Sequence, residues 1–403
     1  MKQIKRSLFI LMGFILVTAL TAFFQYSDIK KQEAPNLTLL FNGEEVNYHQ
    51  ATVHHTLLGF IDVPIYFEKD SNQTFQSQTI LNTLVTPKDS CITIQHPDSN
   101  QTTVCDSSDL EFNENGTYGI KVQFDDSNIM YNFDFTVVVD HHPILTINTL
   151  NPSQGGLVLV TIDNLESDST IEIENHFTPS AILQENHHAT FYLPMAYREN
   201  AQVYPLTVTI NGVPYSYELD VQSFSFREVH FTVASTVVSS TVGNQDAVNQ
   251  YRDVIYPTYE TYEPIVYWTE SFQLPVDGAR KSSEFGEMRF VNNAKTPTRH
   301  AGIDYAVACD TEVVASNAGK VEVAQFLTMI GNTMVIDHGL GLKTYYEHMN
   351  DLVVKAGDVV EKGQLIGHVG TTGYSTGCHL HFQAMVKNQS INPEELYTIL
   401  EGH

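Results

Sequence analysis

The sequence predicts a chain built mainly of β-strands. Between residues 36 and 140, short segments of alternating apolar and polar residues are separated by Asn, Asp, Ser and Gly turns. The same pattern continues between residues 142 and 231, where Asn211-Gly212 has the composition of a two-residue hairpin turn. We therefore expect two immunoglobulin-like β-sandwich domains, residues 33–140 and 141–232, ahead of a further all-β region.

The N-terminus has the composition of an export or anchoring segment. Three basic residues precede Leu8–Phe24, an uncharged run whose length lies between a signal-peptide core and a full membrane span. Ala19–Ala22 offers a poor cleavage site, and bulky Phe23 follows it. Residues 1–25 are therefore interpreted as an uncleaved signal anchor, with a cleaved signal peptide as the alternative. The basic flank should stay in the cytoplasm, which leaves the rest of the chain outside.

The overall charge limits the possible partners. The formal net charge is -26, from 21 basic and 47 acidic residues. Such a surface argues against nucleic acid and against an anionic membrane surface as partners, so membrane contact is expected only through the N-terminal segment. The four cysteines, an even number in an exported chain, indicate disulfides. Cys91 and Cys105 would close a loop of hairpin size.

The elements follow in order along the chain. Residues 246–255 place five apolar side chains on one helical face, and this short helix would end at Pro257. Residues 233–267 are thus interpreted as a linker with a short helix. Trp268 opens the last region and is expected to pack in a core. Strands are predicted at residues 61–67, 118–124, 133–139, 157–162, 171–173, 190–193, 206–210, 213–219, 313–315, 321–326, 333–337 and 343–346.

Five residues of the last region have the composition of a catalytic zinc site. Side chains two or four residues apart on a strand point to the same face, which would bring together His300 with Asp304 and His379 with His381. His348 completes the set. Such a site needs about three protein ligands, a position for water and groups that move protons. Spacing alone leaves open whether His379 or His381 is a ligand.

The order of these motifs resembles peptidase family M23, the zinc metallopeptidases of the lysostaphin and LytM type. The pattern HxxxD is followed by TxYxH at residues 344–348 and by GxHLHF at residues 377–382. Phe285-Gly286 with Arg289 resembles the start of the family pattern. The similarity covers the chain from Trp268 onward, and it implies an antiparallel β-sheet peptidase domain over residues 268–403.

The resemblance also implies roles for the individual residues. His348 and His379 would orient the attacking water and stabilise the oxyanion. Tyr346 would either help to bind the scissile carbonyl or be a tyrosine of the strand core. The implied zinc ligands are His300, Asp304 and His381.

A second disulfide follows from this ligand set. Cys309 lies five residues after Asp304, and Cys378 lies three residues before His381. If Asp304 and His381 hold one ion, the two cysteines must be close, and we expect them to be bonded. Cysteine at position 378 departs from the commoner proline of the family.

The resemblance implies an exported zinc metalloendopeptidase that hydrolyses peptide bonds in the stem or cross-bridge peptides of bacterial peptidoglycan. Such an enzyme would act in the cell envelope, membrane-anchored or alternatively secreted. The sandwiches would hold it at the wall or cover its groove, and residues 326–331 and 370–377 would form groove walls. One alternative is a non-catalytic LytM-like scaffold that activates other wall hydrolases; such proteins usually lose metal ligands. Another is a zinc peptidase that acts on proteins.

Overall fold

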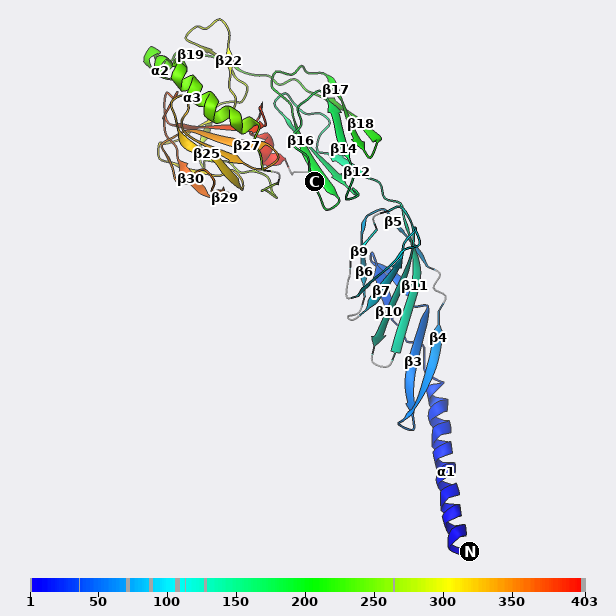
Figure 1. Cartoon of the computed structure of the whole chain (residues 1–403). Coiled ribbons are helices and arrows are strands. Elements are labelled where there is room, and N and C mark those ends of the chain that lie inside the picture. Colours follow the sequence, from blue (N-terminus) through cyan, green and yellow to red (C-terminus); the bar gives the residue numbers. More distant parts are fainter. Residues whose placement is uncertain are drawn as a thin grey trace. The chain divides into compact units, whose positions relative to one another are not determined.

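The chain consists mostly of β-strands, as predicted (Figure 1). The computed structural model describes residues 2–35, 37–69, 73–86, 90–105, 109–112, 114–126, 129–263 and 265–399. Met1 and residues 400–403, which belong to two of the predicted segments, lie outside the described residues. The chain divides into two compact units, Met1–His142 and Pro143–His403.

The first unit starts with the apolar helix α1 (Lys2–Ile29), of which Leu11–Ile29 is long and apolar enough to cross a membrane. Two sheets follow, with strand orders β2-β1-β6-β9 and β4-β3-β11-β10-β7-β8, and β5 pairs in parallel with β11. The described strands are β1 (Thr38–Phe41), β2 (Glu44–Asn47), β3 (Gln50–Leu57), β4 (Ile61–Glu68), β5 (Thr74–Ser77), β6 (Leu81–Val85), β7 (Cys91–Gln95), β8 (Gln101–Cys105), β9 (Asp109–Glu111), β10 (Gly116–Asp126) and β11 (Ile129–Val139).

The two sheets of this unit share one apolar core. Leu39 and Phe41 of β1 belong to the same buried cluster as Ile120 of β10 and Phe133 of β11. Alternation explains the arrangement, because every second residue of β11 is buried along most of its length. Cys91 and Cys105 face each other across β7 and β8 and are bonded.

The second unit begins with two further sheets around a core of their own, with strand orders β12-β13-β16-β15 and β14-β17-β18. The predicted hairpin turn is present between β17 and β18. Asn211 and Gly212 have φ values of 50° and 79°, the left-handed conformation that such a turn requires. The strands are β12 (Ile144–Ile147), β13 (Leu157–Asp163), β14 (Ile171–Asn175), β15 (Leu183–Glu185), β16 (His188–Pro194), β17 (Val203–Ile210) and β18 (Val213–Asp220).

The region predicted as a linker is folded onto the rest of the unit. The strand β19 (Glu228–Phe231) precedes it, and the region itself contains α2 (Ser235–Ser240), α3 (Gln245–Ile255) and a 3₁₀ turn η1 (Tyr256–Tyr259). Asn244 caps the predicted helix α3 by accepting hydrogen bonds from two backbone N–H groups. Thr258 is buried and its hydroxyl lies 2.8 Å from the Tyr345 hydroxyl. Residues 256–263 therefore pack against the last region as part of its fold.

Trp268 packs in a core, as predicted. Its ring stacks on Tyr192 of β16, and both belong to a cluster with Leu157 and Leu159 of β13. The preceding sheets and the last region thus share apolar contacts, which accounts for one compact unit over the described residues after 143. The predicted boundaries 141–232 and 268–403 inside this unit stay predictions.

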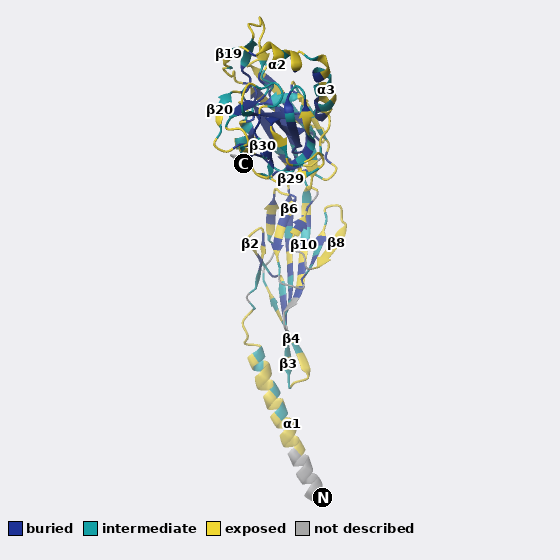
Figure 2. Cartoon of the chain, turned by 90° about the vertical axis from the view of Figure 1, so that its left-hand side faces the viewer, coloured by how far each residue is buried: buried dark blue, intermediate teal, exposed yellow. Residues whose placement is uncertain are grey.

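An antiparallel sheet forms the centre of the last region, in the order β20-β23-β31-β27-β26-β25-β29, with β32 paired to β31. Figure 2 shows buried segments at the centre of this region, and all residues of Leu342–Met349 are buried. The elements are β20 (Arg280–Ser283), β21 (Met288–Val291), β22 (Thr298–Arg299), β23 (Ile303–Ala306), β24 (Glu312–Val314), β25 (Gly319–Leu327), β26 (Gly331–Asp337), β27 (Leu342–Met349), β28 (Asp351–Leu352), β29 (Val359–Val360), β30 (Leu365–His368), β31 (His379–Val386), β32 (Gln389–Ile391) and α4 (Glu395–Thr398).

Candidate metal centre

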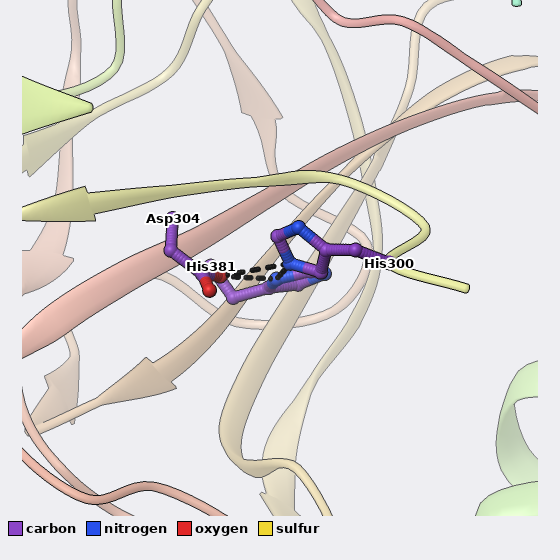
Figure 3. Close-up of side chains that lie close together, drawn as sticks. All are labelled: His300, Asp304 and His381. Atoms are coloured by element: carbon purple, nitrogen blue, oxygen red, sulfur yellow. Dashed lines mark hydrogen bonds and ion pairs between the residues drawn. The ribbon is translucent and has the colours of Figure 1, made fainter. Parts of the chain in front are cut away.

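Three side chains converge on one point above the central sheet (Figure 3). His300 Nε2 lies 3.0 Å from Asp304 Oδ1 and 3.0 Å from His381 Nδ1. His381 Nδ1 lies 2.8 Å from Asp304 Oδ1. Each of these three described residues offers one ligand atom, and the three atoms all lie within 4.8 Å of one another.

Strand register places two of these residues. Asp304 of β23 stands directly opposite His381 of β31, so both side chains leave the same face of the sheet. His300 instead lies in the loop between β22 and β23, so strand alternation does not direct it. Its Nδ1–H donates to the Glu284 carbonyl at 2.8 Å, which turns the Nε2 lone pair toward the other two residues.

The chemistry of this group suits a divalent metal ion. Two imidazole nitrogens and a carboxylate oxygen direct electron pairs at one point, where a cation would relieve their repulsion. Burial lowers the pKa of His300 to about 4, so the ring is neutral near pH 7, as a ligand must be. Burial opposes a charge on Asp304, but charge interactions and hydrogen bonds with the His300 and His381 rings, when these carry the shared protons, hold the pKa of its carboxyl well below the usual value.

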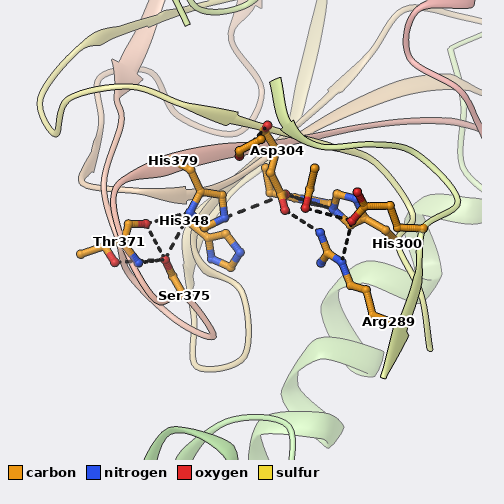
Figure 4. A network of polar contacts seen from close by, with 12 residues as sticks. Arg289, His300, Asp304, His348, Thr371, Ser375 and His379 are labelled. Atoms are coloured by element: carbon orange, nitrogen blue, oxygen red, sulfur yellow. Dashed lines mark hydrogen bonds and ion pairs between the residues drawn. The ribbon is translucent and has the colours of Figure 1, made fainter. Parts of the chain in front are cut away.

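Arg289 holds the other oxygen of the carboxylate ligand (Figure 4). Its Nη2 donates to Asp304 Oδ2 at 2.6 Å, and its Nε lies 3.6 Å from an oxygen of the fully buried Glu287. Glu287 is paired on its other side with Arg227. This chain of charges leaves Oδ1 of Asp304 as the oxygen available to a metal ion.

We expect Arg289→Met to weaken metal binding by about 10–100-fold, the usual effect of removing a group that orients a ligand. Without Arg289, Asp304 loses the bond that fixes its rotation. The dissociation constant, measured by competition with a chromogenic chelator, checks this. Arg252→Met, at an exposed position of α3, is the matched control and should bind metal as the unchanged protein does. Equal affinity in both variants would contradict the role of Arg289.

The two remaining histidines stand beside the three converging residues. His348 Nδ1–H donates to the Thr372 carbonyl at 2.8 Å, and His379 Nδ1–H donates to the Gly377 carbonyl at 2.8 Å. Their Nε2 atoms are left to act on a bound molecule, and His379 Nε2 lies 3.9 Å from Asp304 Oδ1. Burial lowers the pKa of His348 to about 3, which keeps its ring neutral.

A strained backbone turns His348 toward this face. Its φ of 64° lies in the left-handed region, which is uncommon for a residue with a Cβ. The register between β26 and β27 shifts close to the same point. Tyr346 is thereby left in the core while His348, two residues later, lines the cavity. Strain of this kind gathers at functional sites, because the surrounding structure must hold it in place.

Tyr346 lies in the core below the centre. Its side chain is fully buried against Phe382, and its hydroxyl accepts hydrogen bonds from the Ser316 N–H at 2.8 Å and the Thr344 hydroxyl at 3.0 Å. It does not line the cavity at the metal centre. Of the two alternatives for Tyr346, this position agrees with a tyrosine of the strand core. It gives no support to a contact between Tyr346 and the scissile carbonyl.

A cavity of about 610 Å³ opens over the centre. Two of its walls come from the loops named in the sequence analysis, through Met329-Ile330 and Tyr374–Gly377. A third wall was missed, since it comes from the end of the predicted sandwich and the predicted linker. Its residues are Val229, Phe231, Thr232, Val233 and Val242.

Glu347 also lines the cavity and was not predicted as a site residue. It faces His381 across β27 and β31 and is nearly buried. Burial raises the pKa of its carboxyl. Strand alternation did not indicate it, because alternation places Glu347 on the face opposite His348, and both residues line the cavity.

The second expected disulfide is present, since Cys309 and Cys378 are bonded across 69 residues. Cys378 itself lines the cavity beside His379. The bond therefore ties the loop after β23 to the loop that leads into β31. It joins the segments that carry Asp304 and His381.

We expect a double variant, Cys309→Ser with Cys378→Ser, to lower the free energy of unfolding of the second unit by about 4 kcal/mol, because the cross-link restricts its unfolded chain. Chemical denaturation followed by the fluorescence of Trp268 measures this. The control is Cys91→Ser with Cys105→Ser in the other unit, which should leave the Trp268 transition in place. A transition that does not move in the first variant would contradict the expectation.

An all-β domain with two histidines and one aspartate at one point, and two further histidines around an open cavity, has the residue set of a metallopeptidase site. The chain belongs, through its C-terminal region, to peptidase family M23, whose model matches residues 298–393. The expectation drawn from the motifs is thereby confirmed.

Several characterised proteins resemble this region. The peptidoglycan DD-endopeptidase ShyA of Vibrio cholerae is 38% identical over 119 residues, which is 29% of this chain and 28% of that protein. The DD-carboxypeptidase/endopeptidase Mpg of Neisseria gonorrhoeae is 37% identical over 131 residues, or 32% of this chain and 27% of that protein. The chain thus spans less than a third of either relative. The solved catalytic domain of lysostaphin from Staphylococcus simulans is 31% identical, with a TM-score of 0.27, covering 29% of this chain and 91% of that one.

Proposed function

We propose that this protein is a zinc-dependent metalloendopeptidase that hydrolyses peptide bonds in bacterial peptidoglycan. The observation that carries the proposal is the convergence of His300, Asp304 and His381 beside His348 and His379. The similar protein from Vibrio supports the substrate class, because it is a peptidoglycan DD-endopeptidase, and the one from Neisseria, a DD-carboxypeptidase/endopeptidase, supports the peptidase activity.

The roles of the residues follow from their positions. A zinc ion bound by His300, Asp304 and His381 would supply Lewis acidity and a water molecule of lowered pKa. Arg289 holds Asp304 in place, and the Glu284 carbonyl holds His300. His348 and His379 use their Nδ1 atoms in hydrogen bonds to backbone carbonyls and line the cavity. Their Nε2 atoms can therefore orient the attacking water, carry its proton and donate to the oxyanion.

The open cavity suits an extended peptide of the stem or cross-bridge. Two of its walls are loops between strands, at Met329-Ile330 and Tyr374–Gly377, and an extended guest could lie between them. A zinc peptidase acting on proteins would use the same chemistry. A non-catalytic scaffold that activates other wall hydrolases is the alternative from a different class, and it has no need for a complete ligand set.

We further propose that α1 anchors the enzyme to the membrane of the cell envelope as an uncleaved signal anchor. The two-sheet arrangements of residues 38–139 and 144–220 support the assignment of two immunoglobulin-like sandwiches. These would hold the peptidase at the wall or cover its groove.

Digestion of purified peptidoglycan by the full chain in detergent tests the function. New amino groups should appear, a chelator should stop their release, and zinc should restore it. Mass analysis of the fragments then identifies the bond that is cut. Release of reducing sugar ends without amino groups would contradict a peptidase. No release from any wall type, with zinc bound, would favour the scaffold.

A further inference from the structure

The hairpin of β3 and β4 exposes an apolar tip. Leu57 pairs with Ile61, and the turn between them contains Leu58 and Gly59, with φ values of 54° and 77°. Phe60 follows with 78% of its surface exposed, the highest value for a large apolar side chain among the described residues. A soluble surface seldom presents such a group of apolar residues at a turn, where polar residues are usual.

The tip lies against the helix that could cross a membrane. The Leu58 N–H donates to Gln25 Oε1 of α1 at 3.3 Å, and Figure 1 shows the β3–β4 turn beside α1. Both elements belong to the same compact unit. The depth of Gln25 along α1 therefore also sets the depth of the hairpin tip.

Gln25 marks the end of the apolar part of α1. The uncharged run Leu8–Phe24 would be roughly 25 Å long at about 1.5 Å per residue, close to the thickness of a hydrocarbon core. The basic flank before the run should stay in the cytoplasm. Gln25, and with it the tip at Leu58, would then lie in the interfacial layer on the outer side.

The side chains at this level suit that layer. No charged residue occurs between Thr56 and Ile61, and the next one, Asp62, is paired with His54 at 2.9 Å. Tyr26 of α1, the residue that follows Gln25, is exposed. Aromatic residues are enriched at membrane interfaces, where one end of the ring meets lipid and the other meets water.

We propose that the tip of the β3–β4 hairpin, Leu57–Ile61, inserts into the outer interfacial layer of the bilayer beside α1. It forms a second lipid contact, one that limits rotation of the first unit about the end of the helix. The proposal rests on the membrane anchoring by α1 proposed above. A second copy of the chain is a poorer occupant, because a tip of this size offers far less than the ~800 Å² per partner of a stable interface.

The test uses the full chain in phosphatidylcholine vesicles that contain lipids brominated in the upper part of the acyl chains. Phe60→Trp places a fluorophore at the tip, and bromine quenches tryptophan only at short range. The control is Gln101→Trp. The strand register places Gln101 at the opposite end of the large sheet. Gln101 stands opposite Gln95, Gln95 opposite Gly119, and Gly119 opposite Thr136 of β11. The strand β3, in contrast, pairs with residues 129–132, at the other end of β11. Gln101 is exposed, and buried Trp268 contributes the same background to both variants.

We expect the Phe60→Trp emission to shift to the blue on reconstitution and to be quenched by brominated lipid, with no change for Gln101→Trp. Either orientation of the chain reports equally, since both leaflets carry the bromine. Equal quenching in the two variants would overturn the proposal. A blue shift that depends on protein concentration and is not accompanied by quenching from brominated lipid would also overturn the proposal, because it would indicate a second copy at the tip.

Failure of the full chain to float with vesicles would also overturn the proposal, because it removes the anchor. The peptidase assignment is scored separately. Both variants should release amino groups from soluble peptidoglycan fragments at the rate of the unchanged chain, since residues 60 and 101 lie in the unit without the metal centre. Loss of lipid contact with hydrolysis intact would therefore refute the hairpin proposal alone.

Discussion

Replacing His300, Asp304 or His381 by alanine is expected to abolish metal binding and hydrolysis together. Each side chain supplies one of three ligand atoms that lie 2.8–3.0 Å from one another. Two remaining ligands would leave the ion with mostly water around it. Elemental analysis should give close to one zinc per unchanged chain and close to none per variant.

A histidine outside the cluster provides the control for this experiment. His368 of β30 is paired with Asp351 at 2.8 Å and does not line the cavity. The variant His368→Ala should therefore keep both metal and activity. Absence of metal from the unchanged chain, when it is purified without chelator, would contradict the zinc enzyme.

His348→Ala and His379→Ala are expected to keep the metal ion and to lose turnover by about 10²–10⁴-fold, the usual contribution of a positioned acid or base. Neither residue belongs to the cluster of three ligand atoms, and both direct a ring nitrogen toward the same cavity. The loss of activity should appear in kcat and not in KM, because these rings act on the water and the oxyanion and do not bind the rest of the peptide.

Metal content and turnover measured on the same preparations separate the two histidines of the HLH motif. The expected result is that His381→Ala loses zinc while His379→Ala retains it. Retention by His381→Ala and loss by His379→Ala would reverse the assignment. Full activity of His348→Ala would remove that residue from the mechanism.

Local patterns predicted much of the fold because alternation and turn chemistry act over a few residues. The strands at residues 118–124 and 133–139 and the helix at residues 246–255 are examples. The hairpin at Asn211-Gly212 is another, since its positive φ values need those residue types. The N-terminal apolar helix followed from composition alone.

Contacts between distant segments were beyond such patterns. Residues 256–263 resemble a linker, yet Thr258 and the buried Lys343 pack there, with the Lys343 ammonium 2.5 Å from the Thr258 carbonyl. The cavity wall at Val229–Val233 was missed for the same reason. Its position depends on β19 pairing with β21, across about 60 residues of chain.

The sequence by itself determined the family, the inventory of four histidines and one aspartate, and the cysteines close enough to bond. Only the tertiary structure decided which of these atoms meet. It placed His381 beside Asp304 through strand register, directed His300 through the Glu284 carbonyl, and left Tyr346 in the core. Residue types record what chemistry is available, whereas the distances between them depend on which strands become neighbours and how each backbone turns.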